Sequence, residues 1–178
     1  MSRRLKCHNV SINGRDCTER RNKIMEIVDL LTREAVFTGV KAGSKKLAVQ
    51  ELAQRAAKIA NMPERLVFDV LLERERLGTT GVGRGIAIPH GKMAGLDQLY
   101  GVFTRLEEPV DFESVDRQPV DLLFLLLAPE EAGADHLKAL ARISRLFRDT
   151  ALCEELRRAG DPDAMFRLLV EGMPANAA

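Results

Sequence analysis

Residues 120–127, VDLLFLLL, form an almost unbroken apolar run that is followed closely by Pro129. A strand with one face in water alternates apolar and polar side chains, because successive side chains point to opposite faces of the sheet. An unbroken apolar run of this length is typical of a strand that is buried on both faces. The run therefore predicts a central strand in a sheet that helices cover on both sides.

The rest of the chain supplies partners for such a strand. Apolar patterning predicts further strands at 35–40, 86–88 and 99–106. Helical spacing of apolar residues, with capping and breaking residues at the ends, predicts helices at 27–31, 45–60, 63–77, 134–148, 151–159 and 162–170. We therefore expect an α/β fold of a single domain, with one mixed sheet flanked by helices on both faces.

The composition argues against several classes of protein. Aromatic residues make up 4% of the chain, with one Tyr and no Trp, which is unlike a platform for stacked nucleic-acid bases. No run approaches the roughly eighteen apolar residues of a membrane span, and no signal peptide is evident. The sequence thus predicts a cytoplasmic protein without membrane insertion. Cys7, Cys17 and Cys153 form no CxxC pair and are expected to remain thiols.

Positive charge is concentrated at the N-terminus. Residues 1–24 contain seven Lys and Arg against two Asp and Glu, whereas the remainder contains 20 against 24. Because this stretch lacks apolar periodicity, we predict a disordered N-terminal arm at 1–24, a domain at 25–172 and a short tail at 173–178. Met25 also qualifies as the start of translation. Nucleic-acid binding through the arm is an alternative, but no reading motif accompanies it, so we expect no nucleic-acid partner.

A histidine stands at a position that favours access. His90 lies between Pro89 and Gly91, directly after the apolar run 86–88 and the glycine-rich loop 78–85. A neutral imidazole nitrogen can act as a nucleophile, a base or a metal ligand near neutral pH. The loop lacks the Lys-Ser/Thr of a P-loop, so its glycines are expected to allow close approach of a partner. His90 is thus predicted to end a strand and face a partner, with an ordinary turn or core residue as the alternative.

Two further residues are candidates for the same site. His136 lies at the expected N-terminus of a helix, where the macrodipole disfavours the imidazolium and free backbone N–H groups attract anions. The alternative is an exposed histidine with no role. Arg74 belongs to the charged cluster 73–76 that leads into the glycine-rich loop, where a guanidinium could orient a phosphoryl oxygen. The alternative for Arg74 is a solvated helix face.

Three sequence blocks carry a resemblance to a known family. They are RERLGTTG at 74–81 continuing through GVGRGIAIPHGK, QPVDLLF at 118–124, and DHL at 135–137. Together they resemble the enzyme IIA domain of the fructose/mannitol type of phosphotransferase system, and among these the nitrogen-regulatory branch. The resemblance spans about residues 25–170.

The resemblance implies a fold and a set of roles. The family fold is a mixed five-stranded sheet flanked by helices. In the family, the histidine that matches His90 accepts a phosphoryl group on Nε2 from a small histidine phosphocarrier protein, and the residues that match Arg74 and His136 support that group. No cofactor or metal is implied. The chain would then be a regulatory phosphohistidine carrier that acts on its targets according to its phosphorylation state.

Two other functions are considered. A sugar-specific enzyme IIA would pass its phosphoryl group to a IIB domain, and such domains commonly work with IIB and membrane IIC domains. A metal-dependent hydrolase could use His90 and His136, but no HExxH motif or third ligand accompanies them. Arg84 departs from the family pattern. Because it lies six residues before His90, it is expected near the rim of the phosphoryl site.

Overall fold

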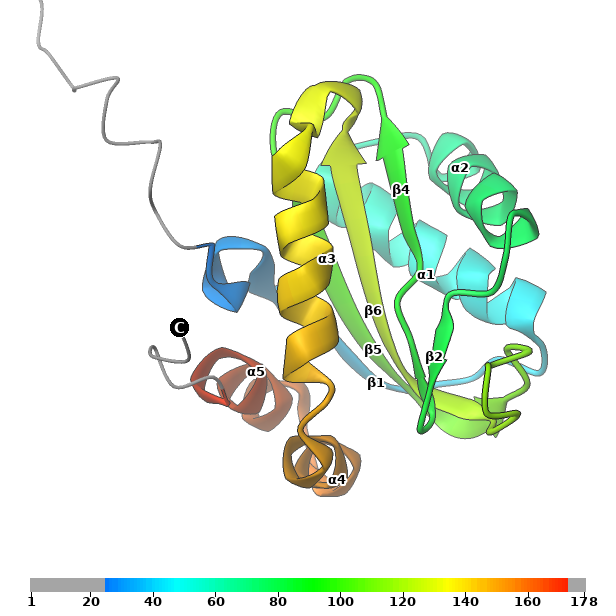
Figure 1. Cartoon of the computed structure of the whole chain (residues 1–178), viewed down its shortest axis with the longest axis vertical. Helices are drawn as coiled ribbons and strands as arrows, with labels where there is room; N and C mark the ends of the chain where they lie inside the picture. Colours follow the sequence, from blue (N-terminus) through cyan, green and yellow to red (C-terminus); the bar gives the residue numbers. More distant parts are fainter. Residues whose placement is uncertain (1–24, 173–178) are drawn as a thin grey trace, which may run out of the picture.

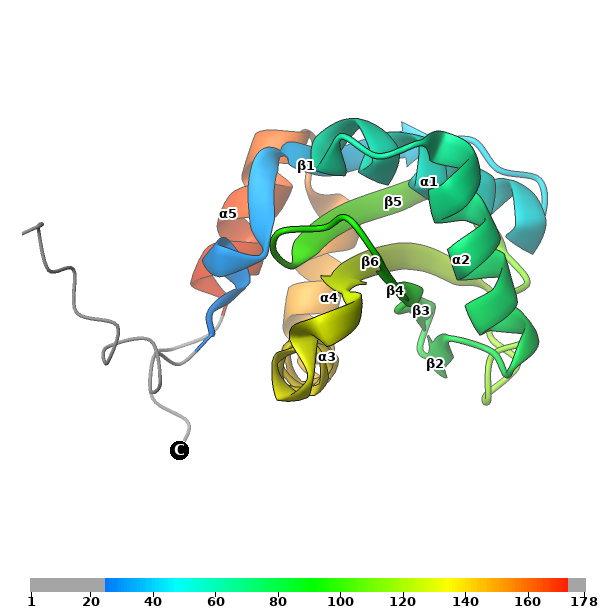
Figure 2. The ribbon, with the colours of Figure 1, turned by 90° about the horizontal axis from the view of Figure 1, so that it is seen from above.

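The computed structural model describes residues 25–172. The predicted arm at 1–24 and tail at 173–178, together with Cys7 and Cys17, lie outside these residues. The described chain forms one sheet with helices on both faces (Figures 1 and 2), which confirms the predicted fold class. None of its helices is both long enough and apolar enough to cross a bilayer. Cys153 is a buried free thiol.

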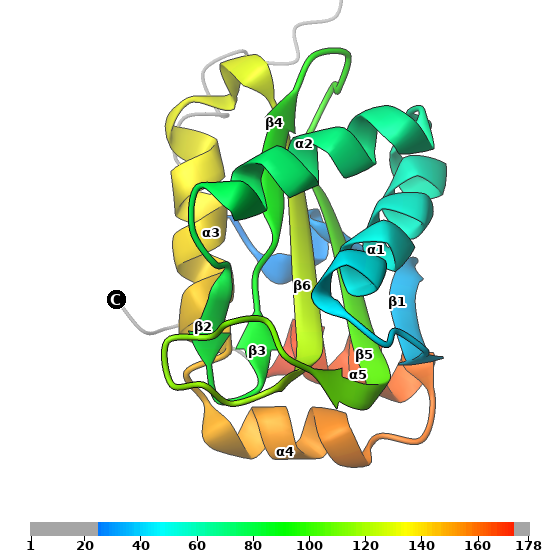
Figure 3. The ribbon, with the colours of Figure 1, turned by 90° about the vertical axis from the view of Figure 1, so that its right-hand side faces the viewer.

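Along the described chain one strand is followed by two helices, then by five strands, and then by three helices. The strands are β1 Leu31–Val40, β2 Gly81–Gly83, β3 Ile86–Ala87, β4 His90–Met93, β5 Tyr100–Val110 and β6 Val120–Pro129. The helices are α1 Lys45–Ala60, α2 Glu64–Arg76, α3 Ala134–Leu146, α4 Thr150–Arg158 and α5 Pro162–Glu171. Short 3-10 turns occur at Ile27–Asp29, where a helix was expected, and at Glu130–Ala132. Helices α1 and α2 cover one face of the sheet, and α3, α4 and α5 cover the other (Figure 3).

Strand β6 occupies the centre of the sheet, as its apolar run predicts. It pairs with β5 in the antiparallel direction and with β3 and β4 in the parallel direction, within the order β1-β5-β6-β3-β2. Every residue of 122–128 is fully buried, and only Asp121 interrupts the burial of the run. Both faces of this strand therefore contribute to the core.

The sheet has six strands instead of the five that the family resemblance implies. Two strands, β2 and β4, lie outside the predicted ones, and β2 falls within the glycine-rich stretch expected to be a loop. Its glycines lie against the chain itself: a side chain at Gly81 would collide with Ser114, and one at Gly83 would press on Asp116. The close approach that these glycines permit is thus internal to the described domain.

Local signals set the helix that precedes the site. The Ser44 hydroxyl accepts a hydrogen bond from the Leu47 amide at 3.3 Å and caps α1, as expected for a serine before an apolar-periodic stretch. Asn61 ends the helix in the left-handed conformation at φ 51°. Pro63 is the N-cap residue of α2, and α1 and α2 pack against each other on one face of the sheet.

Candidate functional site

Three separate elements bring the predicted site residues together. Arg74 lies in the last turn of α2, His90 begins β4, and His136 lies in the first turn of α3. Strand β4 runs between α2 and α3 (Figure 1), and His90 at its start contacts both Arg74 and His136. The ring centroids of the two histidines are 5.6 Å apart. The Arg74 Nε–H group donates a hydrogen bond to His90 Nε2 at 2.9 Å.

The hydrogen bonds of His90 define its tautomer. Nδ1 lies 2.8 Å from the Ile88 carbonyl oxygen, which can only accept, so Nδ1 carries the proton. Nε2 accepts from Arg74 and therefore holds an unshared electron pair. Burial, the largest effect, together with the Arg74 charge lowers the pKa of His90, although the Ile88 bond and Glu75 oppose the shift. The imidazole is thus neutral at physiological pH, with Nε2 as its nucleophilic atom.

His90 is half-buried at the beginning of a strand, whereas the sequence suggested an open position at a strand end. Strand β4 pairs in parallel with β6, where His90 is opposite Leu126. The Cα atom of Gly91 faces Val70 of α2 closely enough that a Cβ atom would lie 2.5 Å from Val70 Cγ1. Glycine at this position therefore lets β4 approach the helix that carries Arg74.

His136 is buried, with 7% of its surface exposed, so it is not the exposed helix-start residue of the alternative interpretation. Its Nε2 atom is buried and has no hydrogen-bond partner among residues 25–172. The pKa of His136 is lowered, first by burial and then by the positive charge that His90 and Lys92 would bring. The helix macrodipole was also expected to disfavour the charged form of His136, but burial is the principal cause of its lowered pKa. The site therefore presents a second neutral imidazole beside His90.

Arg74 is held at two points instead of being solvated. Besides its bond to His90, its Nη1 group donates to the Gly78 carbonyl oxygen at 3.0 Å. The planar guanidinium is therefore already oriented toward the reactive nitrogen before any ligand arrives. The charged cluster at 73–76 accordingly divides between the site and the surface, since Glu73 and Arg76 form an exposed pair with each other.

One charged residue of this cluster was not recognised from the sequence. Glu75 is buried, with its side chain 5% exposed, and it bonds to Thr80 and Lys45. A signal for it exists in the helical spacing: Val67, Leu71 and Glu75 follow one another at intervals of four and are the buried residues of α2. A carboxylate on the apolar stripe of a helix indicates a paired internal group.

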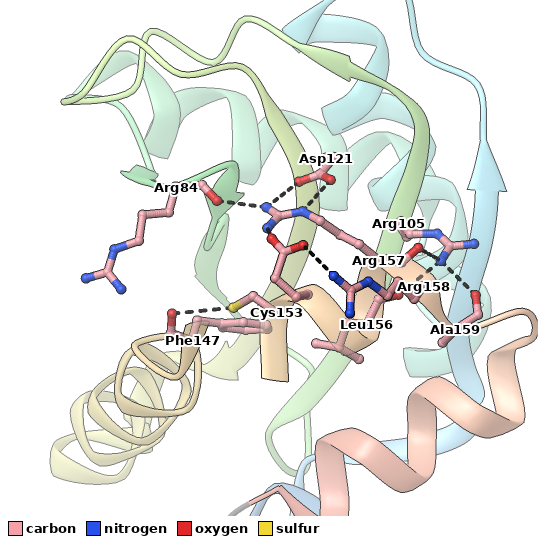
Figure 4. Close-up of polar contacts among 10 residues, drawn as sticks. Arg84, Arg105, Asp121, Phe147, Cys153, Leu156, Arg157, Arg158 and Ala159 are labelled. Atoms are coloured by element: carbon pink, nitrogen blue, oxygen red, sulfur yellow. Dashed lines mark hydrogen bonds and ion pairs between the residues drawn. The ribbon is translucent and has the colours of Figure 1, made fainter. Parts of the chain in front are cut away.

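The expectation that Arg84 lies at the rim of the phosphoryl site is wrong. Its Nη1 group donates to the carbonyl oxygen of Arg148, beyond the C-terminal end of α3, whereas His136 lies in the first turn of that helix. The stretch of α3 from His136 to Leu146 spans about 15 Å. Figure 4 shows the actual surroundings of Arg84, whose carbonyl oxygen accepts from Arg157 at 2.8 Å while Arg157 pairs with Asp121.

Comparisons with known proteins agree with this fold. Residues 29–172 match the family model described as "Phosphoenolpyruvate-dependent sugar phosphotransferase system, EIIA 2". The chain is 56% identical over 154 residues to the nitrogen regulatory protein of Bradyrhizobium diazoefficiens, covering 86% of this chain and 100% of the relative. It is 39% identical over 157 residues to the nitrogen regulatory protein of Escherichia coli, covering 86% and 96%. The crystal structure of nitrogen regulatory protein IIA-Ntr from Neisseria meningitidis superposes with a TM-score of 0.76 at 35% identity, covering 80% and 98%.

The fold and these matches define the class: the protein is a component of a phosphotransferase system. Because the family model covers most of its length, the chain belongs to the EIIA 2 family of that system. Nitrogen regulatory proteins match at 56% and 39% identity, whereas fructose-specific components of Bacillus subtilis and Haloferax volcanii match at 33%. The comparisons therefore confirm the resemblance to the nitrogen-regulatory branch and favour a nitrogen-related component over the sugar-specific alternative.

Proposed function

We propose that the chain carries a phosphoryl group on Nε2 of His90, receives it from a histidine phosphocarrier protein, and regulates target proteins according to its phosphorylation state. One observation carries the proposal. The Ile88 carbonyl oxygen fixes the proton on Nδ1, and so directs the free electron pair of Nε2 toward the arginine. The chain is then a carrier that is modified and discharged, and not a catalyst of repeated turnover.

The transfer step balances without a proton leaving His90. The Nε2 electron pair attacks the phosphorus of the donor phosphohistidine, the donor N–P bond breaks, and the donor imidazole takes the bonding electrons. The proton stays on Nδ1 throughout, hydrogen-bonded to the Ile88 carbonyl oxygen. Phosphoryl transfer requires mainly alignment of the reacting atoms and neutralisation of charge, and both requirements suit this site.

Arg74 and His136 have distinct proposed roles. The Arg74 Nε–H group, 2.9 Å from Nε2 in the free site, would donate to a phosphoryl oxygen once that nitrogen is occupied. The buried Nε2 atom of His136 has no protein partner, so an N–H group there would find its acceptor in a second phosphoryl oxygen. A phosphoryl group would thus complete the hydrogen bonding of the site.

The geometry also bears on the hydrolase alternative. A metal ion on His90 Nε2 would face the Arg74 guanidinium, which already lies at hydrogen-bonding distance from that atom. Like charges at such separation repel strongly in a half-buried site. The arrangement therefore suits an anionic ligand better than a cationic one.

The cytoplasmic location and the absence of a cofactor remain predictions.

Phosphotransfer from phosphoenolpyruvate through purified upstream carriers tests the proposal. We expect one acid-labile phosphoryl group on His90, none in His90→Ala, and faster transfer from a nitrogen-type than from a sugar-type phosphocarrier. The His90→Ala protein should retain its urea midpoint, because the half-buried ring contributes little packing. Label on His136 or on a serine, or full labelling of His90→Ala, would overturn the proposal.

A further inference from the structure

Glu75 is the most completely bonded buried charge of the described chain near the site. Its Oε1 atom accepts from the Thr80 amide at 3.0 Å and lies 2.9 Å from Lys45 Nζ, while Oε2 accepts from the Thr80 hydroxyl at 2.6 Å. The side chains of Glu75 and Lys45 are 5% and 21% exposed. The carboxylate therefore joins the end of α2 to the start of the glycine-rich segment, with its charge balanced by Lys45.

One path from this carboxylate leads to the imidazole through the backbone. The Thr80 carbonyl oxygen accepts from the Ile88 amide at 3.0 Å, and the Ile88 carbonyl oxygen accepts from His90 Nδ1 at 2.8 Å. By holding Thr80, Glu75 thus sets the position of the carbonyl that selects the His90 tautomer. Each bond of this path joins a buried or half-buried pair of residues.

A second path leads to the same imidazole through the arginine. The turn between Glu75 and Thr80 contains Gly78, whose carbonyl oxygen accepts from Arg74 Nη1 at 3.0 Å. The Glu75 carboxylate bonds to Thr80 at the end of this turn and so fixes the turn. It thereby positions the Gly78 carbonyl oxygen that accepts from the Arg74 guanidinium. The positions of the Ile88 carbonyl and of the Arg74 guanidinium, which both bond to His90, therefore depend on the buried Glu75 carboxylate.

We propose that Glu75 is a positioning residue for phosphoryl transfer, which sets the tautomer of His90 and the aim of Arg74 without touching either reacting group. This inference rests on the proposed function of His90. Removal of the carboxylate leaves the amide and hydroxyl of Thr80 without their acceptor, leaves Lys45 paired with Glu113, and releases the turn. A misplacement of about 1 Å at a reacting centre can reduce a rate on the order of 10²-fold, so a loss between about 10-fold and 100-fold is expected.

The test compares Glu75→Ala with two milder changes and one control. Thr80→Val removes only the hydroxyl donor, and Thr80→Ser retains both donors. Glu73→Gln alters a carboxylate two residues away that is 69% exposed and pairs with Arg76. The measurements are single-turnover transfer over a range of phosphocarrier concentrations, urea unfolding, and the ¹⁵N chemical shifts of the His90 ring, which report the tautomer.

A positioning role predicts a lower saturated rate with little change in the half-saturating phosphocarrier concentration. The saturated transfer rate should fall most in Glu75→Ala and less in Thr80→Val. In Thr80→Ser and Glu73→Gln it should equal the rate of the parent protein. The ¹⁵N shifts should show a mixture of His90 tautomers in Glu75→Ala. Parental saturated rates in both Glu75→Ala and Thr80→Val, or a loss that merely follows the unfolded fraction, would overturn the inference.

The design separates this inference from the proposed function. If Glu75→Ala does not fold, Thr80→Val against Thr80→Ser still decides, because it deletes one hydrogen bond and preserves volume. If the parent protein is not labelled on His90, the proposed function fails. The ¹⁵N measurement still tests whether Glu75 sets the His90 tautomer. An unchanged single tautomer in the folded variants would then overturn the positioning role.

Discussion

Replacement of Gly91 by alanine would test whether the contact between β4 and α2 sets the geometry of the site. A Cβ atom at Gly91 would lie 2.5 Å from Cγ1 of Val70, whereas non-bonded carbon atoms are optimally about 3.5–4.0 Å apart. The strand and helix must therefore separate by on the order of 1 Å, or Val70 must leave its rotamer. Valine has one strongly preferred rotamer in a helix, so a rotamer change at Val70 costs free energy, as does separation of the strand from the helix.

The expected cost is that of overpacking, about 1–3 kcal/mol in the free energy of unfolding. Because α2 carries Arg74, the separation should also lengthen the contact between Arg74 Nε and His90 Nε2 and slow phosphoryl transfer. Urea unfolding followed by circular dichroism measures the first effect, and single-turnover labelling measures the second. Gly43→Ala is the matched control, since a Cβ atom there meets nothing within 4 Å, and it should change stability by less than about 0.5 kcal/mol.

The decisive comparison is a double-mutant cycle. Val70→Ala removes the colliding methyl group, so Gly91→Ala should cost less in a Val70→Ala background than in the parent, and transfer should recover. Strict additivity of the two substitutions in stability would refute the steric reasoning. A loss of transfer in Gly91→Ala that persists at the same size in the double variant would refute the link to Arg74.

Acid should destabilise the fold through His136, because its lowered pKa means that the unfolded chain binds more protons as the pH falls below about 6.5. Urea unfolding between about pH 7.5 and 5.5 should show a smaller loss in His136→Gln than in the parent, and equal losses would contradict this. Arg74→Ala should slow single-turnover transfer by up to about 10²–10³-fold, and a parental rate would return Arg74 to a surface role. Asp121→Asn, which weakens the pair with Arg157, should lower stability by about 1–3 kcal/mol. Its transfer rate per folded molecule should stay parental, and a slower rate would show that this contact reaches His90.

Much of the fold could be predicted because its signals are local. The apolar run of β6, the Ser44 cap and the apolar spacing of the helices each act within a few residues, and the structure places these elements at nearly the predicted bounds. Short strands were harder. Strand β2 has three residues and β4 has four, and neither is among the predicted strands, because their pairing depends on neighbours elsewhere in the chain.

By itself, the sequence determined that a central strand lies under helices and that His90 follows a short strand and a glycine-rich segment. Only the tertiary structure decided that His136 is buried, that Arg74 bonds to Nε2, that Glu75 is internal, and that Arg84 lies at the far end of α3. The physical reason is range. Apolar periodicity tells which face of an element is buried, whereas a polar side chain acquires its role from groups that packing brings to it from distant parts of the chain.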